Sequence, residues 1–373
     1  MIRIVIASIL KPIDEVRMYK RFGLSLAKTN KYDVNIIGIN SKKPFTENSN
    51  ITFHTLTQNG RGIKTRLKNL NETRKYLTLI RPEIFIATSP ETLLIALLFS
   101  STKHTKVIYD IQEDYFKNIT LQRVYPTLVK YPLAVLIRSL EIILSKHTSF
   151  FFLAEEIYRQ EISFIRKRKN HIILENKFSG PNHYNLKKNR LPQKIVFTGT
   201  ISYYSGIHHV INTYKEIKKR IPDAELTIAG KCFDNRLIQD LKTLSDTDHN
   251  ITLIGLTDFV SHDDLISEMI NADIAIMGYE PDPVNQHKIP SKLFEYISLN
   301  LITVLCNHPK WIDLFNEFQL GIGINFDSIS AIEIIEKYQK LLLVTNKKDS
   351  YKASWSGVEI SLYKSIDSLI NKS

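Results

Sequence analysis

The sequence has few of the residues that form covalent cross-links or anchor a chain in a membrane. Only two cysteines, Cys232 and Cys306, occur in 373 residues. Two isolated cysteines form neither a disulfide framework nor a zinc site. No apolar stretch reaches the roughly 20 residues that cross a bilayer, and the apolar run at the start is too short for a secretory signal peptide. We therefore expect a cytoplasmic protein.

Acidic residues are also scarce relative to basic ones. The chain has 38 Asp and Glu against 50 Lys and Arg, a formal net charge of +12. Such an excess favours a polyanionic partner: nucleic acid, an anionic membrane surface or a phosphate-bearing substrate. There is no helix-turn-helix, RNA-recognition or zinc-finger pattern, so we expect no nucleic acid. No Gly-x-Gly-x-x-Gly follows the first apolar run, which disfavours a dinucleotide oxidoreductase.

Short apolar runs alternate with longer segments of helical period, twice along the chain. Runs that are apolar on both faces and separated by helices indicate parallel sheets covered on both sides. In the first half, the expected strands are Arg3–Ser8, Asp33–Ile39, Ile51–Leu56, Glu83–Thr88, Lys106–Asp110, Ser149–Leu153 and His171–Glu175. The helical segments between them include Val16–Lys28, Ile63–Leu79 and Thr92–Ser100.

A polar stretch, Phe178–Leu191, is interpreted as an interdomain linker. Beyond it the pattern restarts, with strands expected at Lys194–Thr198, Glu225–Ala229, Ile251–Ile254, Asp273–Met277 and Ile302–Cys306. Helices are expected at Gly206–Arg220, Arg236–Leu244, Asp263–Ile270, Ser291–Leu299 and Ile332–Leu343. The sequence predicts an α/β fold of two doubly wound domains facing each other, with ligands bound in the cleft at the carboxyl ends of the strands.

The segment Lys288–Tyr296 carries the strongest local signal. Pro290 suits the first position of a helix, where its missing N–H costs nothing. The free N–H groups and positive dipole end of that helix suit a phosphate, and Lys288 and Lys292 add charge. Glu295, one turn further, can accept two hydrogen bonds from a ribose. An ordinary amphipathic surface helix with solvated Lys and Glu side chains explains the same pattern.

These residues resemble the donor-site signature of the retaining GT-B glycosyltransferases of the GT4 (glycosyl transferases group 1) type, a Pro-x-Lys-Leu-x-Glu-Tyr helix followed by a strand. Lys194–Gly206 is similar to the strand, glycine loop and helix that open the family's second domain. Glu225–Lys231 and Ile251–Gly255 resemble its next strands. In the first half, Val107–Tyr115 resembles the family's acidic loop at the domain cleft.

The resemblance covers most of the chain and implies a GT-B fold of two Rossmann-like domains. It places an acceptor-side domain at 1–180, a nucleotide-sugar-binding domain at 181–350 and a helix that crosses back to the first domain at 351–373. It also implies the functional residues. The donor-binding candidates are Gly199, Thr200, Ser202, Ser205, Lys231, Lys288, Ser291, Lys292 and Glu295, the last holding the ribose. The catalytic or sugar-orienting candidates are Asp110, Glu113, Asp114 and His287.

The sequence departs from the family where the donor diphosphate is neutralised. An Arg and a Lys are common in the loop before the second-domain helix, and Thr200 and Ser205 stand there instead. His287 replaces a common acidic residue, Gln112 a common histidine, and Leu10-Lys11-Pro12 a Gly-Gly loop. A diphosphate facing no cation in a dry cleft is costly. The candidate substitutes are Lys11, Lys231, Lys288 and Lys292, with hydroxyl and N–H groups of Thr200–Ser205.

The implied activity is that of a glycosyltransferase of hexosyltransferase type. It moves a sugar, with retention, from a nucleotide-diphosphate donor to a glycan or lipid-linked acceptor in surface polysaccharide synthesis. Catalysis then depends on positioning and leaving-group charge rather than on a side-chain nucleophile. No Asp-x-Asp motif stands in a plausible donor loop, so we expect no metal or other cofactor. Two alternatives stay open: a catalytically impaired GT-B partner subunit, and a nucleotide-sugar epimerase on the same fold.

The segment Arg61–Leu77 is a basic helical stretch. Ile63, Leu67, Leu70 and Leu77 are expected near one stripe, with Arg66, Lys68, Arg74 and Lys75 on the rest of the helix. Basic amphipathic helices can dock on anionic membrane surfaces. This predicts peripheral association with the inner face of a membrane, and an ordinary surface helix is the alternative interpretation.

Overall fold

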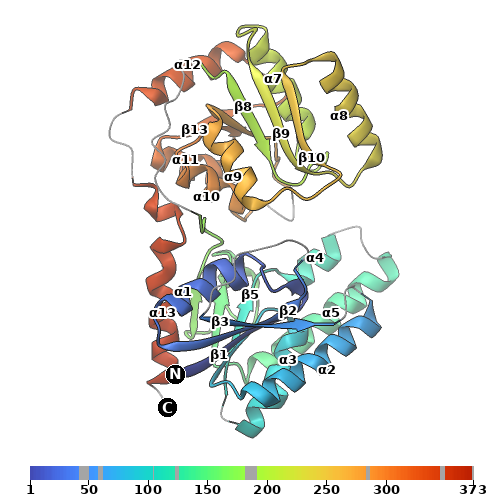
Figure 1. The fold of residues 1–373 in the computed structure, drawn as a ribbon, viewed down its shortest axis with the longest axis vertical. Coiled ribbons are helices and arrows are strands. Elements are labelled where there is room, and N and C mark those ends of the chain that lie inside the picture. Colours follow the sequence, from blue (N-terminus) through green and yellow to red (C-terminus); the bar gives the residue numbers. More distant parts are fainter. Residues whose placement is uncertain are drawn as a thin grey trace. The chain divides into compact units, whose positions relative to one another are not determined.

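The computed structural model describes residues 1–41, 50–57, 62–103, 105–121, 126–180, 191–282, 286–344 and 349–371, without the side chains of 98–103 and 127. The chain divides into two compact units (Figure 1). The first comprises Met1–Ser179 and Trp355–Ser373, and the second comprises Gly180–Ser354. Most of the expected linker lies outside the described residues.

The first unit is built on a seven-stranded sheet in the order β3-β2-β1-β4-β5-β6-β7, and every neighbouring pair is parallel. The strands are β1 (Ile2–Pro12), β2 (Tyr32–Ile39), β3 (Ile51–Leu56), β4 (Ile84–Ala87), β5 (Lys106–Ile111), β6 (Phe150–Leu153) and β7 (His171–Ile173). The inner strands are mostly buried on both faces, as a covered parallel sheet requires, while the edge strands β3 and β7 are partly exposed. All seven predicted strands are present. β1 extends beyond its predicted end to Pro12, with a register shift after Ala7.

Helices cover both faces of this sheet (Figure 1). They are the π-helix η1 (Arg17–Gly23), α1 (Leu24–Lys28), α2 (Ile63–Ile80), α3 (Pro90–Lys103), α4 (Tyr115–Leu121), α5 (Thr127–Ser145), α6 (Tyr158–Glu161) and α13 (Ser356–Ile370). Leu77, Leu93 and Leu144 of α2, α3 and α5 pack in one core. Phe22 of η1 and Ile366 of α13 pack in the core on the other face. The final helix is therefore part of the first unit.

The orientation of α2 differs from the prediction. Its buried positions are Asn69, Thr73 and Leu77, while Ile63 and Leu67 are 78% and 61% exposed. The Asn69 amide donates a 2.9 Å hydrogen bond to a backbone carbonyl of β1, which turns this polar side of the helix towards the sheet. Of the predicted apolar stripe, Leu77 is therefore buried against the sheet, whereas Ile63 and Leu67 lie at the surface.

The second unit has a six-stranded parallel sheet in the order β10-β9-β8-β11-β12-β13. The strands are β8 (Lys194–Thr198), β9 (Glu225–Lys231), β10 (Ile251–Leu256), β11 (Ile274–Met277), β12 (Ile302–Cys306) and β13 (Gly321–Ile324). The helices are α7 (Ile207–Lys218), α8 (Asn235–Thr247), α9 (His262–Asn271), α10 (Ser291–Ser298), α11 (Pro309–Phe318), α12 (Ala331–Leu342) and the 3-10 helix η2 (Ser350–Ala353). The five predicted strands are present, and β13 and α11 are additional. Among the described residues, no helix is long and apolar enough to cross a membrane.

Candidate functional site

Strand order in the second unit reverses between β8 and β11, which are neighbours in the sheet. In doubly wound sheets, ligands bind in the crevice at such a switch point. The backbones of the loops after β8 and β11 touch at Gly206 and Gly278. A Cβ on Gly206 would lie 1.7 Å from the Gly278 carbonyl oxygen, and Gly206 has a φ of +70°. Only glycine fits this approach without strain.

Glu295 lies beside this crevice, on α10, and is 8% exposed. The Lys292 Nζ is 2.8 Å from its Oε2 atom, and the His262 Nε2 is 3.6 Å from its Oε1 atom. Burial alone would raise the pKa of Glu295, but the Lys292 ammonium and the His262 ring outweigh it and lower this pKa to about 2. The carboxylate is therefore ionised at neutral pH. Since a carboxylate has about four lone-pair sites, each oxygen can still accept a hydroxyl.

Gly199, at the end of β8, lies next to this ion pair. A Cβ placed on Gly199 would be 3.7 Å from the Lys292 Cε, so the lysine stem crosses the end of β8. Gly199 has a φ of +124°, and the space of a Cβ on Gly230 is filled by the Gly199 carbonyl oxygen at 1.7 Å. The fold thus brings together the glycine loop and the Lys–Glu pair of α10. A charged pair therefore lies against the end of β8, next to the switch point.

Ser202 and Ser205 are committed to hydrogen bonds within the loop between β8 and α7. Each hydroxyl accepts from the other residue's backbone N–H at 3.0 Å, and the Ser205 hydroxyl also donates to the Ser202 carbonyl at 2.8 Å. These bonds fix the loop and use groups that were expected to contact a diphosphate. Thr200, in contrast, is exposed.

Lys231, at the end of β9, is held by two aromatic rings. Its Nζ lies 4.1 Å from the centroid of Phe259 and 5.4 Å from that of Phe233. Both rings are more than half exposed and meet edge to face, with centroids 6.4 Å apart. An exposed pair of rings beside a cation offers an apolar surface next to a positive charge, which suits a nucleobase.

The segment before α10 is tied to α11. The Trp311 ring donates a 2.8 Å hydrogen bond to the Lys288 carbonyl, and the Lys310 ammonium donates one of 3.0 Å to the His287 carbonyl. The side chains of His287 and Ser291 are exposed. Pro290 is the N-cap of α10 rather than its first helical residue, one position from the prediction, because its ψ of 134° is extended. The first backbone N–H groups of α10 nevertheless follow directly after this segment.

The start of α7 carries a second polar group in the same unit. The His209 Nε2 lies 3.5 Å from the Glu280 Oε2, and the His209 ring stacks on Phe326 with centroids 4.6 Å apart. The ring of His208 is 3.9 Å from that of His209, and burial with this neighbour lowers the pKa of His208. This His–Glu pair follows the two loops that meet at Gly206.

In the first unit, Asp110 is completely enclosed. It lies in β5, and the Nε and Nη2 atoms of Arg17 donate to its two oxygens over distances of 2.7–3.1 Å. The Gln112 amide donates a further 2.7 Å bond. Arg17 is 1% exposed, so neither partner is open to a substrate in this structure. We therefore assign Asp110 a structural position rather than a catalytic one.

The other two acids of this loop differ from each other. Asp114 is 3% exposed, pairs with Arg138 of α5 and accepts a 3.2 Å bond from a backbone N–H in the first turn of α4. It acts as a helix cap and is paired with a partly buried cation. Glu113 is exposed and accepts a 2.7 Å bond from the Asn118 amide. Of the three predicted acids, Glu113 alone is placed to meet a ligand.

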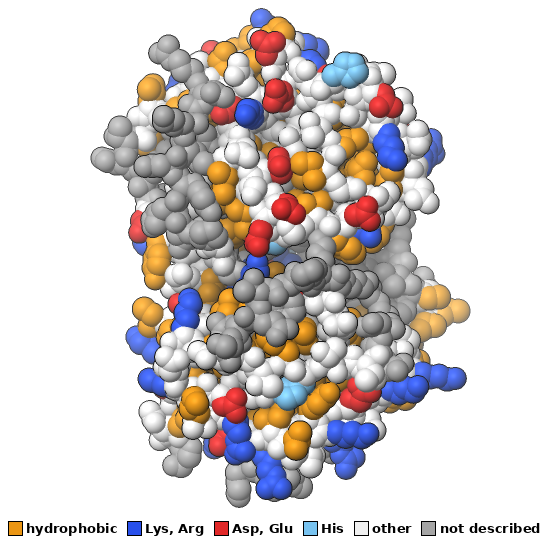
Figure 2. Space-filling model, in the orientation of Figure 1, with side chains coloured by type: hydrophobic (Ala, Val, Ile, Leu, Met, Phe, Trp, Pro, Cys, Tyr) orange, Lys and Arg blue, Asp and Glu red, His pale blue; other side chains and the backbone are white. Residues whose placement is uncertain are grey.

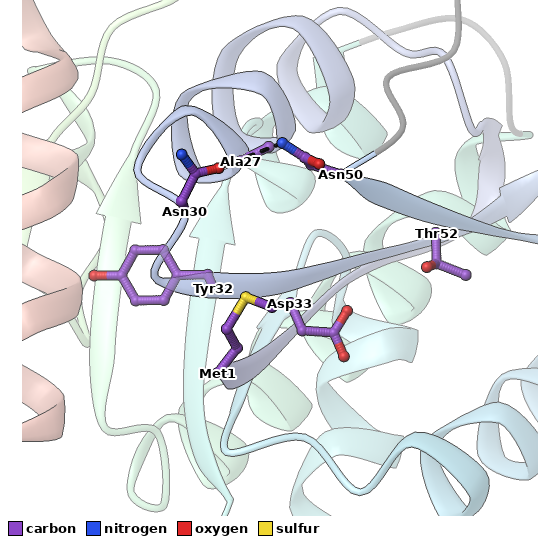
Figure 3. Close-up of a pocket in the computed structure, with 7 residues that line it drawn as sticks. All are labelled: Met1, Ala27, Asn30, Tyr32, Asp33, Asn50 and Thr52. Carbon is purple, nitrogen blue, oxygen red and sulfur yellow. Dashed lines mark hydrogen bonds between the residues drawn. The ribbon is translucent and has the colours of Figure 1, made fainter.

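A surface pocket of about 300 Å³ lies at the other end of the first sheet (Figure 3). It is lined by Met1, Ala27, Asn30, Tyr32, Asp33, Asn50 and Thr52. Met1, Tyr32 and Asp33 stand at the amino ends of β1 and β2. Ligands of doubly wound sheets bind at the opposite, carboxyl ends. This pocket is therefore not a candidate for the principal site.

The comparison with protein families decides the identity of the second unit. Residues 182–354 match the family model described as glycosyl transferases group 1, which covers nearly the whole unit. This unit is a group 1 glycosyltransferase domain. Among curated proteins, no sequence matches the chain. Within the group 1 domain, the structure brings Gly199, Lys292 and Glu295 together, whereas Lys231 is held by aromatic rings.

Solved structures confirm the fold of the whole chain. Sucrose-phosphate synthase from Thermosynechococcus elongatus is 12% identical, with a TM-score of 0.67 and full coverage of both chains. Anabaena HepE in complex with UDP and glucose is 12% identical, with a TM-score of 0.60 over 99% of this chain and 100% of that one. A putative UDP-N-acetylglucosamine 2-epimerase from Listeria monocytogenes is 10% identical, with a TM-score of 0.63 over 100% and 97%. The chain therefore has the GT-B fold, with a group 1 domain as its second half.

Several residues around the group 1 crevice were not identified from the sequence. They are His262, which contacts Glu295, the rings Phe233 and Phe259, and the pair His209 and Glu280. No local motif marks them, because they come from several separate segments that follow β8, β9, β10 and β11. The topology alone brings these segments together.

Proposed function

We propose that this protein is a glycosyltransferase that moves a sugar from a nucleotide-diphosphate donor to a glycan or lipid-linked acceptor. The observation that carries the proposal is the pair of the buried Glu295 and the partly buried Lys292 beside the switch point of a group 1 domain. An ionised carboxylate and an ammonium group side by side match the two ends of a nucleoside diphosphate, its ribose hydroxyls and its phosphates. HepE, which shares the fold, is known in complex with UDP and glucose.

Each part of the donor then has a counterpart in this unit. Glu295 accepts hydrogen bonds from the ribose hydroxyls. Lys292 neutralises part of the diphosphate charge together with the N-terminus of α10, while Lys288 and Ser291 lie at the start of that helix. Gly199 leaves room for the diphosphate to approach the end of β8. The exposed rings next to Lys231 provide the platform for the base.

We propose that transfer proceeds with retention, the acceptor hydroxyl attacking on the face from which the diphosphate leaves. The bond from the anomeric carbon to the diphosphate oxygen breaks, and a bond from that carbon to the acceptor oxygen forms. The acceptor proton passes to the departing phosphate oxygen. Lys292 and the α10 N-terminus stabilise the developing negative charge, so no side-chain nucleophile is needed.

The acceptor belongs to the first unit in this proposal. The carboxyl edge of its sheet carries Lys11, which contacts Glu15 and Gln112, and the exposed Glu113. These groups can hydrogen-bond the hydroxyls of a sugar. A hexosyltransferase acting in surface polysaccharide synthesis at the cytoplasmic side of a membrane fits such an acceptor.

Nucleotide titration tests the donor site. Calorimetry with UDP, GDP and ADP should detect binding of at least one, and Glu295→Gln should weaken it by about 1–3 kcal/mol. Glu333→Gln is a matched control, since Glu333 is half-exposed on α12 and pairs with Lys337 at 2.6 Å. No binding of any of the three nucleotides would overturn the proposal.

We further propose that donor binding needs no divalent metal. Lys292 and the α10 N-terminus supply the positive charge that a metal would otherwise provide. Titration in EDTA should give the same affinity as titration with Mn²⁺. Affinity that is lost in EDTA and restored by Mn²⁺ would show that the charge comes from an ion.

A nucleotide-sugar epimerase is the second candidate. The likeness to the Listeria epimerase fold and the His209–Glu280 pair near the crevice favour it. Epimerisation next to the anomeric carbon breaks a C–H bond, so the sugar should acquire deuterium from heavy water. Transfer to an acceptor leaves that hydrogen in place. Nucleotide binding with neither reaction would identify the impaired partner subunit.

A further inference from the structure

Helix α5 of the first unit exposes a continuous apolar face. The exposed side chains are Leu128, Val129, Tyr131, Val135, Leu136, Ile142 and Ile143. Leu128 is 91% exposed and Leu136 is 66% exposed. A surface helix normally turns its apolar stripe inwards and its polar residues outwards. A contiguous exposed apolar surface of this kind marks a site of interaction.

The inner side of α5 is already packed, so this face has no place in the core. Ala134 and Leu144 are buried on the side towards the sheet. The partly buried Arg138 and the buried Glu141 also point inwards, where Arg138 pairs with Asp114. The charged residues Arg138 and Glu141 therefore lie on the inner side of the helix, while large apolar side chains remain on its outer side. Figure 2 shows hydrophobic side chains at the surface on the side of the first unit where α5 runs in Figure 1.

The charge around this face is of one sign. Between residues 126 and 150, the one acidic residue is Glu141, which is 1% exposed and accepts a 2.7 Å hydrogen bond from the Tyr109 hydroxyl. Exposed cations follow at the C-terminal end. Lys146 caps the helix, and the turn at 166–169 (Arg-Lys-Arg-Lys) is attached there, since the Arg168 guanidinium donates a 3.2 Å bond to the Ser145 hydroxyl.

Helix α2 extends the same layer. Both α2 and α5 pack against α3 on one face of the sheet (Figure 1). The outer side of α2 carries exposed cations at Lys64, Lys68, Arg74 and Lys75, with Ile63 and Leu67 among them. Arg66 is engaged with Glu91 of α3 instead. The outer surface of this layer thus combines an apolar helix with a basic one.

We propose that the α5 face docks on an anionic membrane surface, with the helix lying flat at the boundary between headgroups and acyl chains. Apolar side chains enter the boundary while Lys146, the 166–169 turn and the α2 cations meet lipid phosphates. A second copy of the chain fits less well, because a two-fold contact would place this positively charged surface against the same positively charged surface of the partner. The proposal is independent of the donor chemistry in the second unit.

The position of the helices gives this contact a functional direction. In right-handed crossovers, α2, α3 and α5 each begin at the carboxyl edge of the sheet, the edge that carries Lys11 and Glu113. Leu128 and Ile63, the first exposed apolar residues of α5 and α2, lie at this edge. Docking would bring the proposed acceptor side to the level of the lipid headgroups.

Vesicle co-sedimentation tests the proposal. The full chain should sediment with phosphatidylglycerol–phosphatidylcholine vesicles and much less with phosphatidylcholine alone. The triple variant Leu128→Ser, Leu136→Ser, Ile143→Ser should reduce the partition coefficient at least about tenfold. Ile360→Ser is the matched control, because Ile360 is 58% exposed on α13, which covers the opposite face of the sheet. Circular dichroism should report unchanged folding, since all four side chains are exposed.

The basic component can be separated from the apolar one. Lys64→Glu with Lys68→Glu should weaken sedimentation several-fold at low salt and have little effect at high salt, where the Debye length falls from about 10 Å to about 3 Å. Equal sedimentation of the triple variant and the wild type would overturn the proposal. A second result would also overturn it: the wild type forms a dimer in analytical ultracentrifugation, the triple variant does not, and the wild type does not sediment with vesicles. A second copy of the chain would then cover α5. Nucleotide binding is measured for every variant in parallel. A loss of sedimentation can then be distinguished from a failure of the proposed donor site.

Discussion

Replacing Arg17 with methionine should destabilise the first unit by about 3–5 kcal/mol, because the Asp110 carboxylate is then left buried without its cation. Asp110 has no exposed surface and Arg17 is 1% exposed. The guanidinium spans both carboxylate oxygens at 2.7–3.1 Å. Its Nη1 atom also donates to the Leu174 carbonyl at 2.7 Å and to the Asn176 amide oxygen at 2.9 Å. One substitution therefore removes the cation and two further bonds.

The double variant Arg17→Met, Asp110→Leu should recover part of this loss. Replacing both members of a buried ion pair with apolar side chains is often neutral or stabilising, whereas removing one leaves an uncompensated charge. We expect the double variant to be more stable than Arg17→Met by about 2 kcal/mol. The carbonyl at Leu174 stays without its donor in both variants, so full recovery is not expected.

Tryptophan fluorescence during urea unfolding can measure this effect in one unit. Trp355 belongs to the first unit and Trp311 to the second, and both are buried. In a Trp311→Phe background, emission reports the first unit alone. This separation is needed because a chain of two units need not unfold in a single transition.

The result also decides the role of Asp110. If the carboxylate were catalytic and the ion pair incidental, Arg17→Met would reduce turnover and leave the urea midpoint nearly unchanged. A loss of less than about 1 kcal/mol, or a double variant no more stable than the single one, would refute the structural assignment.

Three further changes follow from the geometry. The Lys292 ammonium helps lower the pKa of Glu295 to about 2. The ionised carboxylate therefore stabilises the fold above about pH 4.5, and this stabilisation is lost as the pH falls towards 2. Lys292→Met should move the loss to higher pH in urea titrations, and an unchanged pH profile would contradict this prediction. Burial raises the pKa of Glu141 to about 7. The unfolding free energy of the first unit should therefore fall by roughly 2–4 kcal/mol as the pH rises from about 4.5 to 7. Glu141→Gln should remove this pH dependence, and a wild-type stability that stays constant over this range would argue against the prediction. Gly206→Ala should destabilise the second unit by about 3 kcal/mol or more, because its Cβ would overlap a backbone carbonyl at 1.7 Å. Gly62→Ala, at the N-cap of α2 with nothing within 4 Å of its Cβ, should cost about 1 kcal/mol or less. Equal losses of unfolding free energy in the two variants would count against the contact.

Most of the fold could be predicted from the sequence because the strands are continuous apolar runs buried on both faces. β13 escaped prediction because its four residues include Gly321 and Gly323, so its apolar run is too short to stand out. The π-helix η1 was expected as an ordinary helix, since its period differs little over seven residues. Its side chains Arg17 and Arg21 bind backbone carbonyls after β7, contacts that no local pattern can indicate.

The sequence predicted the candidate donor site only where its residues are close together along the chain. Lys292 and Glu295 are three residues apart on one helix, and that spacing places them side by side. His262 reaches the same carboxylate from the start of α9, and Phe259 reaches Lys231 from the loop before it. These contacts depend on the neighbouring positions of β8, β9 and β10. They become visible when the order of the strands is known.

Asp110 did carry a signal of its burial in the sequence. In a strand, alternate side chains face opposite sides of the sheet, and Tyr109 and Ile111 face the core beneath α3 and α5. Asp110 must therefore face the other side with Ile108, which packs under η1 and α13. A carboxylate inside a covered parallel strand requires a cation on the helix that covers that side, and η1 supplies Arg17. A charged residue within a covered strand thus needs a buried partner, whereas one in the loop after the strand can stay exposed. By this reasoning Glu113, beyond the end of β5, is the acid that remains available to a substrate.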